Sequence, residues 1–207
     1  MSRPQAVIFD IGNVLIGWEP LAFYDRTIGP EARARLFAEV DMDAMNAMVD
    51  AGAPLYDTVL SCAEDYPHWS AEIMLWHDRW AEMLTPVIEP SVRLLHALKA
   101  KGVPAFALSN FGAETFERTR QGLPFLNTFD RSYISGRLGV SKPDPRIYEI
   151  VEADCGLPPG DLLFTDDRAD NIAAAAARGW QTHLFTGPEP FARRLVAAGL
   201  LNESDLA

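Results

Sequence analysis

Short, mostly apolar runs recur along the chain, and each is followed by a polar residue. The runs occupy residues 5–9, 104–108, 162–165 and, more briefly, 182–185. Runs of this kind are typical of strands that are buried on both faces of a parallel sheet. Helical patterns lie between them, over residues 92–101 and over an alanine-rich stretch at 172–177 that Gly179 can end. The alternation of strands and helices predicts an α/β fold with a parallel sheet.

Residues 18–86 interrupt this alternation, and no strand is expected there. Four helices are predicted in this segment, at residues 20–28, 31–40, 54–63 and 70–84. Ser70 is a suitable N-cap for the last of them. We therefore expect two domains, a helical cap at residues 18–86 and a core made of residues 1–17 and 87–207.

Four of the five tryptophans fall in the predicted cap, namely Trp18, Trp69, Trp76 and Trp80. Trp76 and Trp80 are four residues apart and therefore share a helix face. The simpler expectation is that these side chains pack the cap against the core, and the alternative is that one or two of them line a pocket.

The polar residue that ends the first run is a carboxylate, Asp10. Parallel sheets place their chemistry at the carboxyl ends of the strands. Gly12 follows closely and frees the backbone to turn. A carboxylate in this position can act as a covalent nucleophile or hold a hard cation.

Three further polar clusters follow strands or precede helices. Ser109 and Asn110 follow the second run, a proline-stiffened loop carries Lys142, and Asp166 and Asp167 follow the third run. Each cluster alone has a plain structural explanation, such as a turn, a loop or a helix cap. Together they supply a nucleophile, a hydroxyl donor, a cation and paired carboxylates that a divalent cation would compensate. This combination indicates phosphoryl transfer, in which positioning and charge stabilisation dominate catalysis.

The charge balance narrows the class of partner. The 207 residues carry a formal net charge of −11, with a pI near 4.7, which disfavours nucleic acids and anionic membranes as partners. No apolar stretch approaches the ~20 residues that cross a bilayer. Cys62 and Cys155 lie far apart and are expected to be buried free thiols. With no signal peptide visible before the first strand, we expect a cytoplasmic protein.

These motifs resemble those of the haloacid dehalogenase (HAD) superfamily over nearly the whole chain. The resemblance implies a Rossmann-like core with an inserted helical cap above the active site. The Gly-Asn form of the first motif is similar to the branch with sugar phosphatases such as α-D-glucose-1-phosphate phosphatase. The matching segments are Phe9-Asp10-Ile11-Gly12-Asn13-Val14-Leu15, Leu108-Ser109-Asn110, Ser141-Lys142-Pro143 and the stretch from Phe164-Thr165-Asp166-Asp167 through Asn171.

The resemblance implies roles for the residues that meet the substrate. Asp10 attacks phosphorus and forms an aspartyl-phosphate, while Ser109, nearby N–H groups and Lys142 hold the phosphoryl oxygens. Lys142 also steadies Asp10. The residues expected to bind substrate are Gly12, Asn13, Ser109, Asn110 and Lys142.

The resemblance also implies a Mg²⁺ cofactor. Its ligands would be Asp10, the main-chain carbonyl of Gly12 and Asp167, with water completing an octahedron. Asp166 and Asn171 would support the metal or Lys142. Which of Asp166 and Asp167 binds the metal directly is left open.

One position departs from the family pattern. Most phosphatases of the superfamily carry an acid/base Asp two residues after the nucleophile, where this chain has Gly12. General acid catalysis is typically worth ~10²–10⁴-fold. Three explanations stay open: an acid from elsewhere, such as Glu19 or a cap residue; a substrate with a good leaving group; or a weakly active or non-catalytic binding protein.

A second alternative is a 2-haloacid dehalogenase-type hydrolase, in which the same Asp attacks carbon without a metal. The retained Asp166 and Asp167 argue against it. Arg26, Arg33 and Arg35 are candidates for halide or carboxylate binding, although surface positions are the simpler expectation for them. His68 and His77 are expected to be structural or exposed, and adjacent helix residues such as His77 and Asp78 are not expected to face each other.

The sequence thus predicts a Mg²⁺-dependent phosphatase acting on a small phosphorylated metabolite, with a sugar phosphate favoured. No nucleic acid or membrane partner is expected, and the choice between monomer and homodimer is left open.

Overall fold

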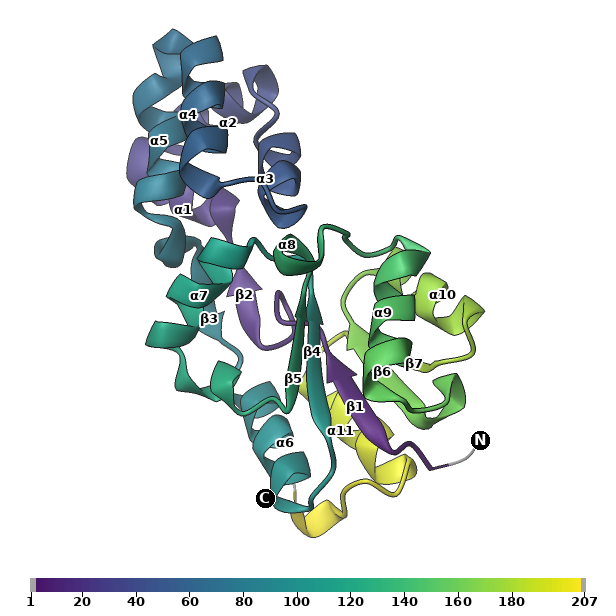
Figure 1. Cartoon of the computed structure of the whole chain (residues 1–207). Coiled ribbons are helices and arrows are strands. Elements are labelled where there is room, and N and C mark those ends of the chain that lie inside the picture. The colour runs from purple at the N-terminus through teal and green to yellow at the C-terminus, as the bar shows by residue number, and fades with distance from the viewer. Residues whose placement is uncertain (1–2, 206–207) are drawn as a thin grey trace.

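A five-stranded parallel sheet lies at the centre of the protein (Figure 1). The computed structural model describes residues 3–205. The strand order is β5-β4-β1-β6-β7, and every pairing is parallel. The strands are β1 (Ala6–Phe9), β4 (Ala105–Ser109), β5 (Arg131–Ile134), β6 (Leu162–Asp166) and β7 (Gln181–Leu184). The predicted α/β fold with a parallel sheet is confirmed, and the four predicted strands are present, whereas β5 was not predicted.

Within the described residues, six α-helices accompany this sheet. They are α6 (Glu89–Ala100), α7 (Ala113–Gly122), α8 (Ser135–Leu138), α9 (Pro145–Cys155), α10 (Ala169–Ala177) and α11 (Pro188–Ala197), with 3₁₀ turns at Pro124–Asn127, Pro159–Asp161 and Glu203–Asp205. Among these helices, α6, α9, α10 and α11 supply the buried residues that pack on the two faces of the sheet. Successive side chains of β1 enter different cores, because a strand alternates its faces. Val7 and Phe9 pack in the core that also holds buried residues of α6 and α11, whereas Ala6 and Ile8 pack with those of α9 and α10.

The register of the sheet brings the polar strand ends together. Phe9 of β1 lies beside Ala107 of β4 and Thr165 of β6. Asp10 therefore emerges between the ends of β4 and β6, where Ser109 and Asp166 lie. This edge is the one at which parallel α/β sheets hold their ligands.

A helical segment extends from this edge of the sheet (Figure 1). It consists of α1 (Pro20–Ile28), α2 (Pro30–Glu39), α3 (Met42–Asp50), α4 (Leu55–Asp65) and α5 (Ser70–Asp78), with 3₁₀ turns at Pro67–Trp69 and Trp80–Met83. Two short antiparallel strands, β2 (Ile16–Trp18) and β3 (Leu84–Val87), join it to the core. The expectation that residues 18–86 hold no strand was therefore wrong. Both strands are short, and they contain Gly17 and Pro86, which weaken the sequence signal.

Three other local predictions need correction. Helix α3 was not predicted, although Asp41 caps it by accepting a hydrogen bond from the backbone N–H of Ala44 at 2.8 Å. The helix expected at residues 70–84 ends at Asp78, and a 3₁₀ turn follows. Ser70 is the first residue of α5, and Trp69 occupies the N-cap position without a side-chain cap.

Aromatic side chains fill the interior of the helical segment. The ring centroids of Trp18 and Trp80 are 4.8 Å apart, and those of Trp76 and Trp80 are 6.0 Å apart. Trp76 is fully buried. The side chains of Trp76 and Trp80 are in contact, but they do not share a helix face as predicted, because α5 ends at Asp78 and Trp80 begins the 3₁₀ turn that follows. Trp18 and Trp80 form part of the wall of the pocket described below.

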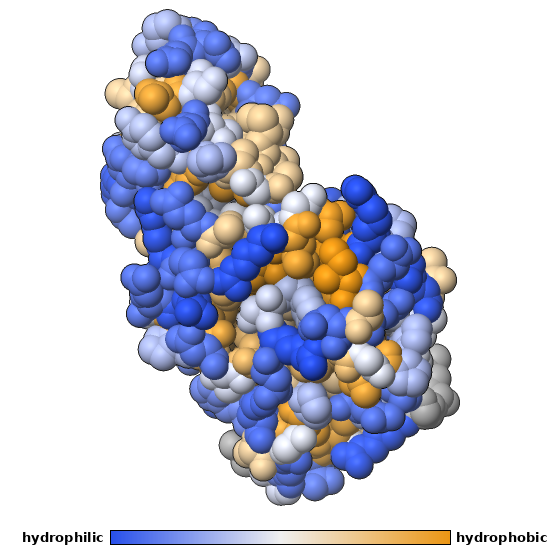
Figure 2. All heavy atoms as spheres, viewed as in Figure 1, coloured by the Kyte–Doolittle hydropathy of each residue, from blue (hydrophilic) through white to orange (hydrophobic). Residues whose placement is uncertain are grey.

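The outer surface of the helical segment is mainly hydrophilic on the face shown in Figure 2, whereas hydrophobic residues gather on the core beside α8 and α9. Among the helices of residues 3–205, none has the length and apolar character needed to cross a bilayer. Cys62 and Cys155 are free thiols, as predicted, but both are partly rather than fully buried. The predicted core range also includes residues 1–2 and 206–207, and the expectation of no signal peptide concerns Met1 and Ser2 as well. All of these lie outside the described residues.

Candidate active site

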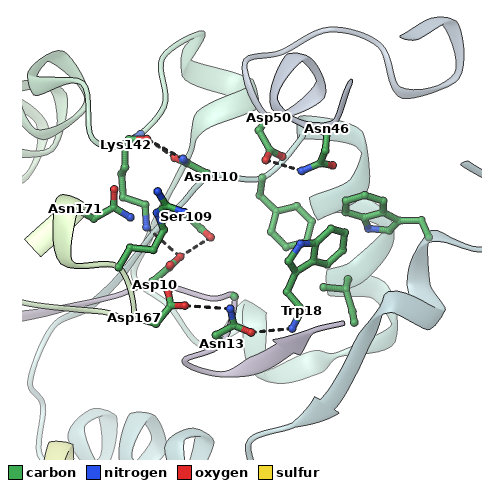
Figure 3. A pocket seen from close by; sticks show the side chains of 15 residues that line it. Asp10, Asn13, Trp18, Asn46, Asp50, Ser109, Asn110, Lys142, Asp167 and Asn171 are labelled. Carbon is green, nitrogen blue, oxygen red and sulfur yellow. Dashed lines mark hydrogen bonds and ion pairs between the residues drawn. The ribbon is translucent and has the colours of Figure 1, made fainter. Parts of the chain in front are cut away.

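Asp10 is held by three donors at the end of β1 (Figure 3). The hydroxyl of Ser109 donates to Asp10 Oδ1 at 2.7 Å, and the backbone N–H of Ile11 donates to the same atom at 2.7 Å. Lys142 Nζ lies 3.0 Å from that oxygen. The Asp10 residue is only 7% exposed. These contacts fix the orientation of the carboxylate at the floor of a pocket.

Lys142 connects the polar ends of three strands. Besides Asp10, its Nζ donates to the carbonyl of Leu108 at 2.8 Å and to Asp166 Oδ2 at 2.6 Å. Asn110 secures the lysine loop, because its Nδ2 donates to the carbonyl of Lys142 at 2.9 Å and its Oδ1 accepts from the Lys142 N–H at 2.8 Å. The lysine side chain is almost completely buried. Its ammonium group is therefore positioned as a fixed charge.

Three carboxylates meet at this point. Ligand oxygens of Asp10, Asp166 and Asp167 lie within 4.8 Å of one another. Asp166 is saturated by donors: Asn171 Nδ2 lies 3.0 Å from both of its oxygens, and the N–H of Arg168 donates to Oδ1 at 2.8 Å. Asp167 is more open, and its Oδ2 accepts from Asn13 Nδ2 at 3.0 Å.

The donor set suits a hard divalent cation. Carboxylate and carbonyl oxygens are the ligands that Mg²⁺ and Ca²⁺ prefer. Within the described residues, Asn171 Oδ1 is a buried acceptor without a partner. It lines the same pocket as Asp10 and Asp167. A cation here would also offset three neighbouring negative charges that Lys142 alone does not balance.

Burial and neighbouring charges shift the titration of the central pair. Burial raises the pKa of Asp10 to about 7, an effect that Lys142 opposes and Asp166 reinforces. Burial would lower the pKa of Lys142, but the charges of Asp10 and Asp166 outweigh it and raise that pKa. Lys142 is therefore a permanent cation in this site.

The pocket has a volume of about 330 Å³ and lies between the core and the helical segment. The core contributes the polar residues described above and Phe111. The opposite wall is formed by Trp18, Asn46, Asp50, Trp80 and Leu84. Asn46 and Asp50 were missed by the sequence analysis because they lie on the unpredicted helix α3. The cap at Asp41 and the spacing of Met42, Met45 and Val49 were the signals that could have revealed this helix.

The position two residues after Asp10 is open. A Cβ atom added at Gly12 would meet no heavy atom within 4 Å. Space for an acidic side chain therefore exists at this point of the pocket wall, but the chain does not supply one. Glu19, one of the expected replacements, is exposed and does not line the pocket.

The other residues of the helical segment that were singled out in the sequence lie elsewhere. Arg26 donates to the carbonyl of Glu82 at 2.7 Å, Arg33 pairs with Asp25 at 2.8 Å, and the guanidinium of Arg35 lies 5.6 Å from the ring centroid of Trp69. None of these three arginines lines the pocket.

The two histidines of the helical segment, His68 and His77, are also outside the pocket. His68 contacts Glu39 at 2.9 Å, and His77 contacts Asp78 at 2.8 Å. The expectation that His77 and Asp78 do not face each other was wrong, because Asp78 is the last residue of α5, where the helix geometry ends. Arg168, which lines the pocket, pairs with Asp170 at 2.7 Å.

Comparison with known proteins identifies the family. A family model described as haloacid dehalogenase-like hydrolase matches residues 4–179. The chain therefore belongs to the haloacid dehalogenase-like hydrolases, as its motifs indicated, and it is a hydrolase.

Several curated proteins are similar to this chain. Enolase-phosphatase E1 of Acidiphilium cryptum is 29% identical over 91% of this chain and 87% of that protein. A phosphorylated carbohydrates phosphatase of Thermotoga maritima is 26% identical over 84% of this chain and 82% of that protein. Drimenol cyclase drtB of Aspergillus calidoustus is 25% identical over 92% of this chain, but the chain spans only 36% of that longer protein.

Solved structures share the fold. A HAD family enzyme from Bacteroides thetaiotaomicron, in complex with magnesium and inorganic phosphate, superposes with a TM-score of 0.67 at 20% identity, covering 89% of this chain and 95% of that one. L-2-haloacid dehalogenase from Xanthobacter autotrophicus, with chloropropionic acid covalently bound, superposes with a TM-score of 0.61 at 18% identity. The superposition covers 98% of this chain and 86% of that one. Because similar folds support different reactions, the choice between a phosphatase and a dehalogenase must be argued from the residues of the site.

Proposed function

We propose that this protein is a Mg²⁺-dependent phosphatase that hydrolyses a small phosphorylated metabolite through an aspartyl-phosphate at Asp10. The observation that carries this proposal is the contact of one buried carboxylate with Ser109 and Lys142, directly beside Asp166 and Asp167. Phosphoryl transfer needs this combination of a fixed nucleophile and concentrated positive charge.

In this proposal the groups at the floor of the pocket divide the work. Asp10 attacks phosphorus, while Ser109 and Lys142 hold the phosphoryl oxygens. Gly12, Asn13 and Asn110 also line the phosphate end of the pocket, and Asn110 acts by securing the loop of Lys142. The fixed ammonium group offsets the charge that develops on the phosphoryl oxygens.

The proposed Mg²⁺ ligands are Asp10, the carbonyl of Gly12 and Asp167. Asp166 instead orients Lys142 and Asn171, since both of its oxygens already accept hydrogen bonds from protein groups. When bound, the metal would neutralise phosphate charge and orient the phosphoryl group.

A sugar phosphate is the substrate class that we favour. The wall opposite the nucleophile combines the flat rings of Trp18 and Trp80 with the polar side chains of Asn46 and Asp50. Such a wall suits a leaving group that has both apolar faces and hydroxyl groups. We further propose that residues 18–86 act as a cap over a core of residues 1–17 and 87–207.

The dehalogenase alternative is less well supported by this site. Excess negative charge from Asp166 and Asp167 disfavours a substrate carboxylate, and the three candidate arginines contact other groups. Chelation separates the two functions, because it should abolish phosphatase turnover and leave dehalogenation intact.

The test is a screen of phosphorylated metabolites with Mg²⁺, in which Asp10→Asn serves as the control. We expect turnover of a subset of the compounds, loss of at least 10³-fold in Asp10→Asn, and stoichiometric binding of beryllium fluoride, a mimic of the phosphoryl group, by the wild-type protein alone. Failure of the Mg²⁺-saturated wild type both to turn over any phosphate ester and to bind beryllium fluoride would overturn the proposal.

A further inference from the structure

The proposed phosphatase reaction needs a proton donor that Gly12 does not supply. When Asp10 displaces an ester oxygen from phosphorus, that oxygen leaves as an alkoxide unless a neighbouring group protonates it. The following inference deepens the proposed function and rests on it. The question is which side chain of this pocket can give a proton to the leaving oxygen.

Three carboxyl groups line the pocket within the described part of the chain, namely Asp10, Asp50 and Asp167. Asp10 is assigned to attack on phosphorus, and Asp167 accepts from Asn13 beside it in the acidic cluster. Asp50 alone belongs to the opposite wall, where the leaving group of a substrate bound at Asp10 would lie. Histidines 68 and 77 and Glu19 do not line the pocket.

Asp50 ends helix α3, and its carboxyl group extends into the pocket (Figure 3). Asn46, one turn earlier, donates from Nδ2 to Asp50 Oδ2 at 2.9 Å. The backbone N–H of Gly112, on the core, lies near enough to the carboxyl group to lower its pKa. The side chain is therefore held by one contact from each side of the pocket, and its position does not depend on the cap alone.

The end of α3 is also attached to the core by its backbone and by close packing. Ser135 Oγ donates to the carbonyl of Asp50 at 2.5 Å, and Ser141 Oγ, next to Lys142, lies 3.4 Å from the same carbonyl. Gly112 allows this approach, because a Cβ atom there would lie 2.6 Å from Val49 Cγ1. These contacts fix the position of Asp50 relative to the loop that carries Lys142.

We propose that Asp50 is the general acid and base of the reaction. In the first step, an oxygen of Asp10 forms a bond to phosphorus, the bond from phosphorus to the ester oxygen breaks, and the proton of the Asp50 carboxyl group passes to that oxygen. The alcohol leaves neutral, and Asp50 is left as a carboxylate.

In the second step, the Asp50 carboxylate takes a proton from a water molecule as its oxygen attacks phosphorus. The bond between phosphorus and Asp10 breaks, inorganic phosphate leaves, and both carboxyl groups return to their starting states. One water is consumed for each ester hydrolysed, and one alcohol and one phosphate are released.

The electrostatic surroundings of Asp50 suit both states. Burial raises the pKa of its carboxyl group to about 7, and the negative charge of Asp10 adds to this shift. The Gly112 N–H, Asn46 and Lys142 each act in the opposite direction and lower the pKa. A carboxyl group with a pKa near neutrality is populated in both protonation states, as an acid that later acts as a base requires.

The test compares Asp50→Asn with wild type on esters whose alcohols leave with different ease. For an alkyl phosphate we expect kcat/KM to fall by about 10²–10⁴-fold. For p-nitrophenyl phosphate, whose leaving group needs no proton, we expect kcat/KM to fall less than 10-fold and a burst of one nitrophenol per enzyme, because hydrolysis of the aspartyl-phosphate has lost its base. Asp43→Asn, an exposed carboxylate on the same helix, is the matched control and should behave as wild type.

A rescue variant separates catalysis from structure. Because the space beside Gly12 is open, Gly12→Asp in the Asp50→Asn background should restore at least 10-fold of the lost activity on the alkyl ester. An equal loss for all leaving groups, without a burst and without rescue, would overturn the role of Asp50. Wild type that neither turns over phosphate esters nor binds beryllium fluoride would instead overturn the proposed function itself.

Discussion

Lys142 is the buried cation of the catalytic edge within residues 3–205, and it faces two buried carboxylates, Asp10 and Asp166. A buried charge is tolerated when its partners remain in place, and the loss of one partner leaves the others uncompensated. The lysine is therefore a structural counter-charge as well as a proposed ligand of phosphate.

Removal of this charge should destabilise the folded protein even when no substrate is present. We expect Lys142→Met to lower the free energy of unfolding by about 3–5 kcal/mol in metal-free buffer. Saturating Mg²⁺ should restore part of the loss, since a bound cation replaces the missing charge. Urea denaturation with and without metal measures both effects. A loss below about 1 kcal/mol would show that the two carboxylates do not depend on the lysine.

The raised pKa of Asp50 gives a second prediction, for the pH dependence of stability. The pKa is about 7 in the folded protein against an ordinary value of 3.8, so the folded state favours the protonated form and stability falls as the pH rises to and through about 7. Between pH 5.5 and 8.5 this group should cost wild type about 2 kcal/mol. Asp50→Asn should lack that loss, while Asp43→Asn should retain it, as measured by urea denaturation in metal-free buffer. Parallel pH profiles for wild type and Asp50→Asn would contradict the shift.

At the scale of residues, the sequence was informative where chemistry follows the end of a strand. Asp10, Ser109 and Asp166 each follow or end a continuous apolar run, so their convergence could be predicted from parallel pairing alone. Asp50 carried no such signal. Its role depends on proximity to Gly112 and on burial against the core, which arise only when α3 meets the loop of Gly112, 62 residues further along the chain.

At the scale of elements, β2 and β3 hold the helical segment on the core through a very close backbone contact. A Cβ atom added at Gly17 of β2 would lie 2.5 Å from the carbonyl oxygen of Thr85 in β3. Trp18, the next residue, forms part of the pocket wall. The β2–β3 pair therefore couples the position of the helical segment to the shape of the site.

We expect Gly17→Ala to push the two strands apart, to destabilise the protein by about 1–3 kcal/mol and to raise KM through displacement of Trp18. Gly122→Ala is the matched control, since Gly122 is exposed at the end of α7 with no heavy atom within 4 Å of its added Cβ. Thermal unfolding and steady-state kinetics compare the two. Equal behaviour of both variants would show that the contact between β2 and β3 is adaptable.

The elements that could not be predicted were short or mixed in polarity. β5 has the sequence Arg-Ser-Tyr-Ile, and only its last two residues are buried, so it lacks the apolar run that identified β1 and β6. An edge strand gains its place from pairing with β4 rather than from its own hydrophobicity. Helix α5 was predicted to be longer than it is, because the apolar pattern continues through Trp80 after the α-helical geometry has ended.

At the scale of the whole molecule, the net charge of −11 opposes an anionic substrate. The Debye length falls from about 30 Å at 0.01 M to about 8 Å at 0.15 M ionic strength, so long-range repulsion is screened while contacts in the pocket persist. We therefore expect kcat/KM for a phosphate ester to rise several-fold over this range at saturating free Mg²⁺, with kcat nearly constant. A steady fall of kcat/KM with salt would show that Lys142 and Arg168 dominate the field at the pocket mouth.

The pairing of Ile16 with Val87 places the two crossings of the chain between core and cap side by side, about 4.7–4.9 Å apart. All residues between these two crossings are therefore joined to the sheet at one place, the β2–β3 pair. A different helical segment joined at the same pair of strands would leave the floor of the site unchanged. It would replace Asp50 together with the aromatic wall of the pocket. Substrate choice and proton donation would then be inherited as a unit, separately from the attacking carboxylate.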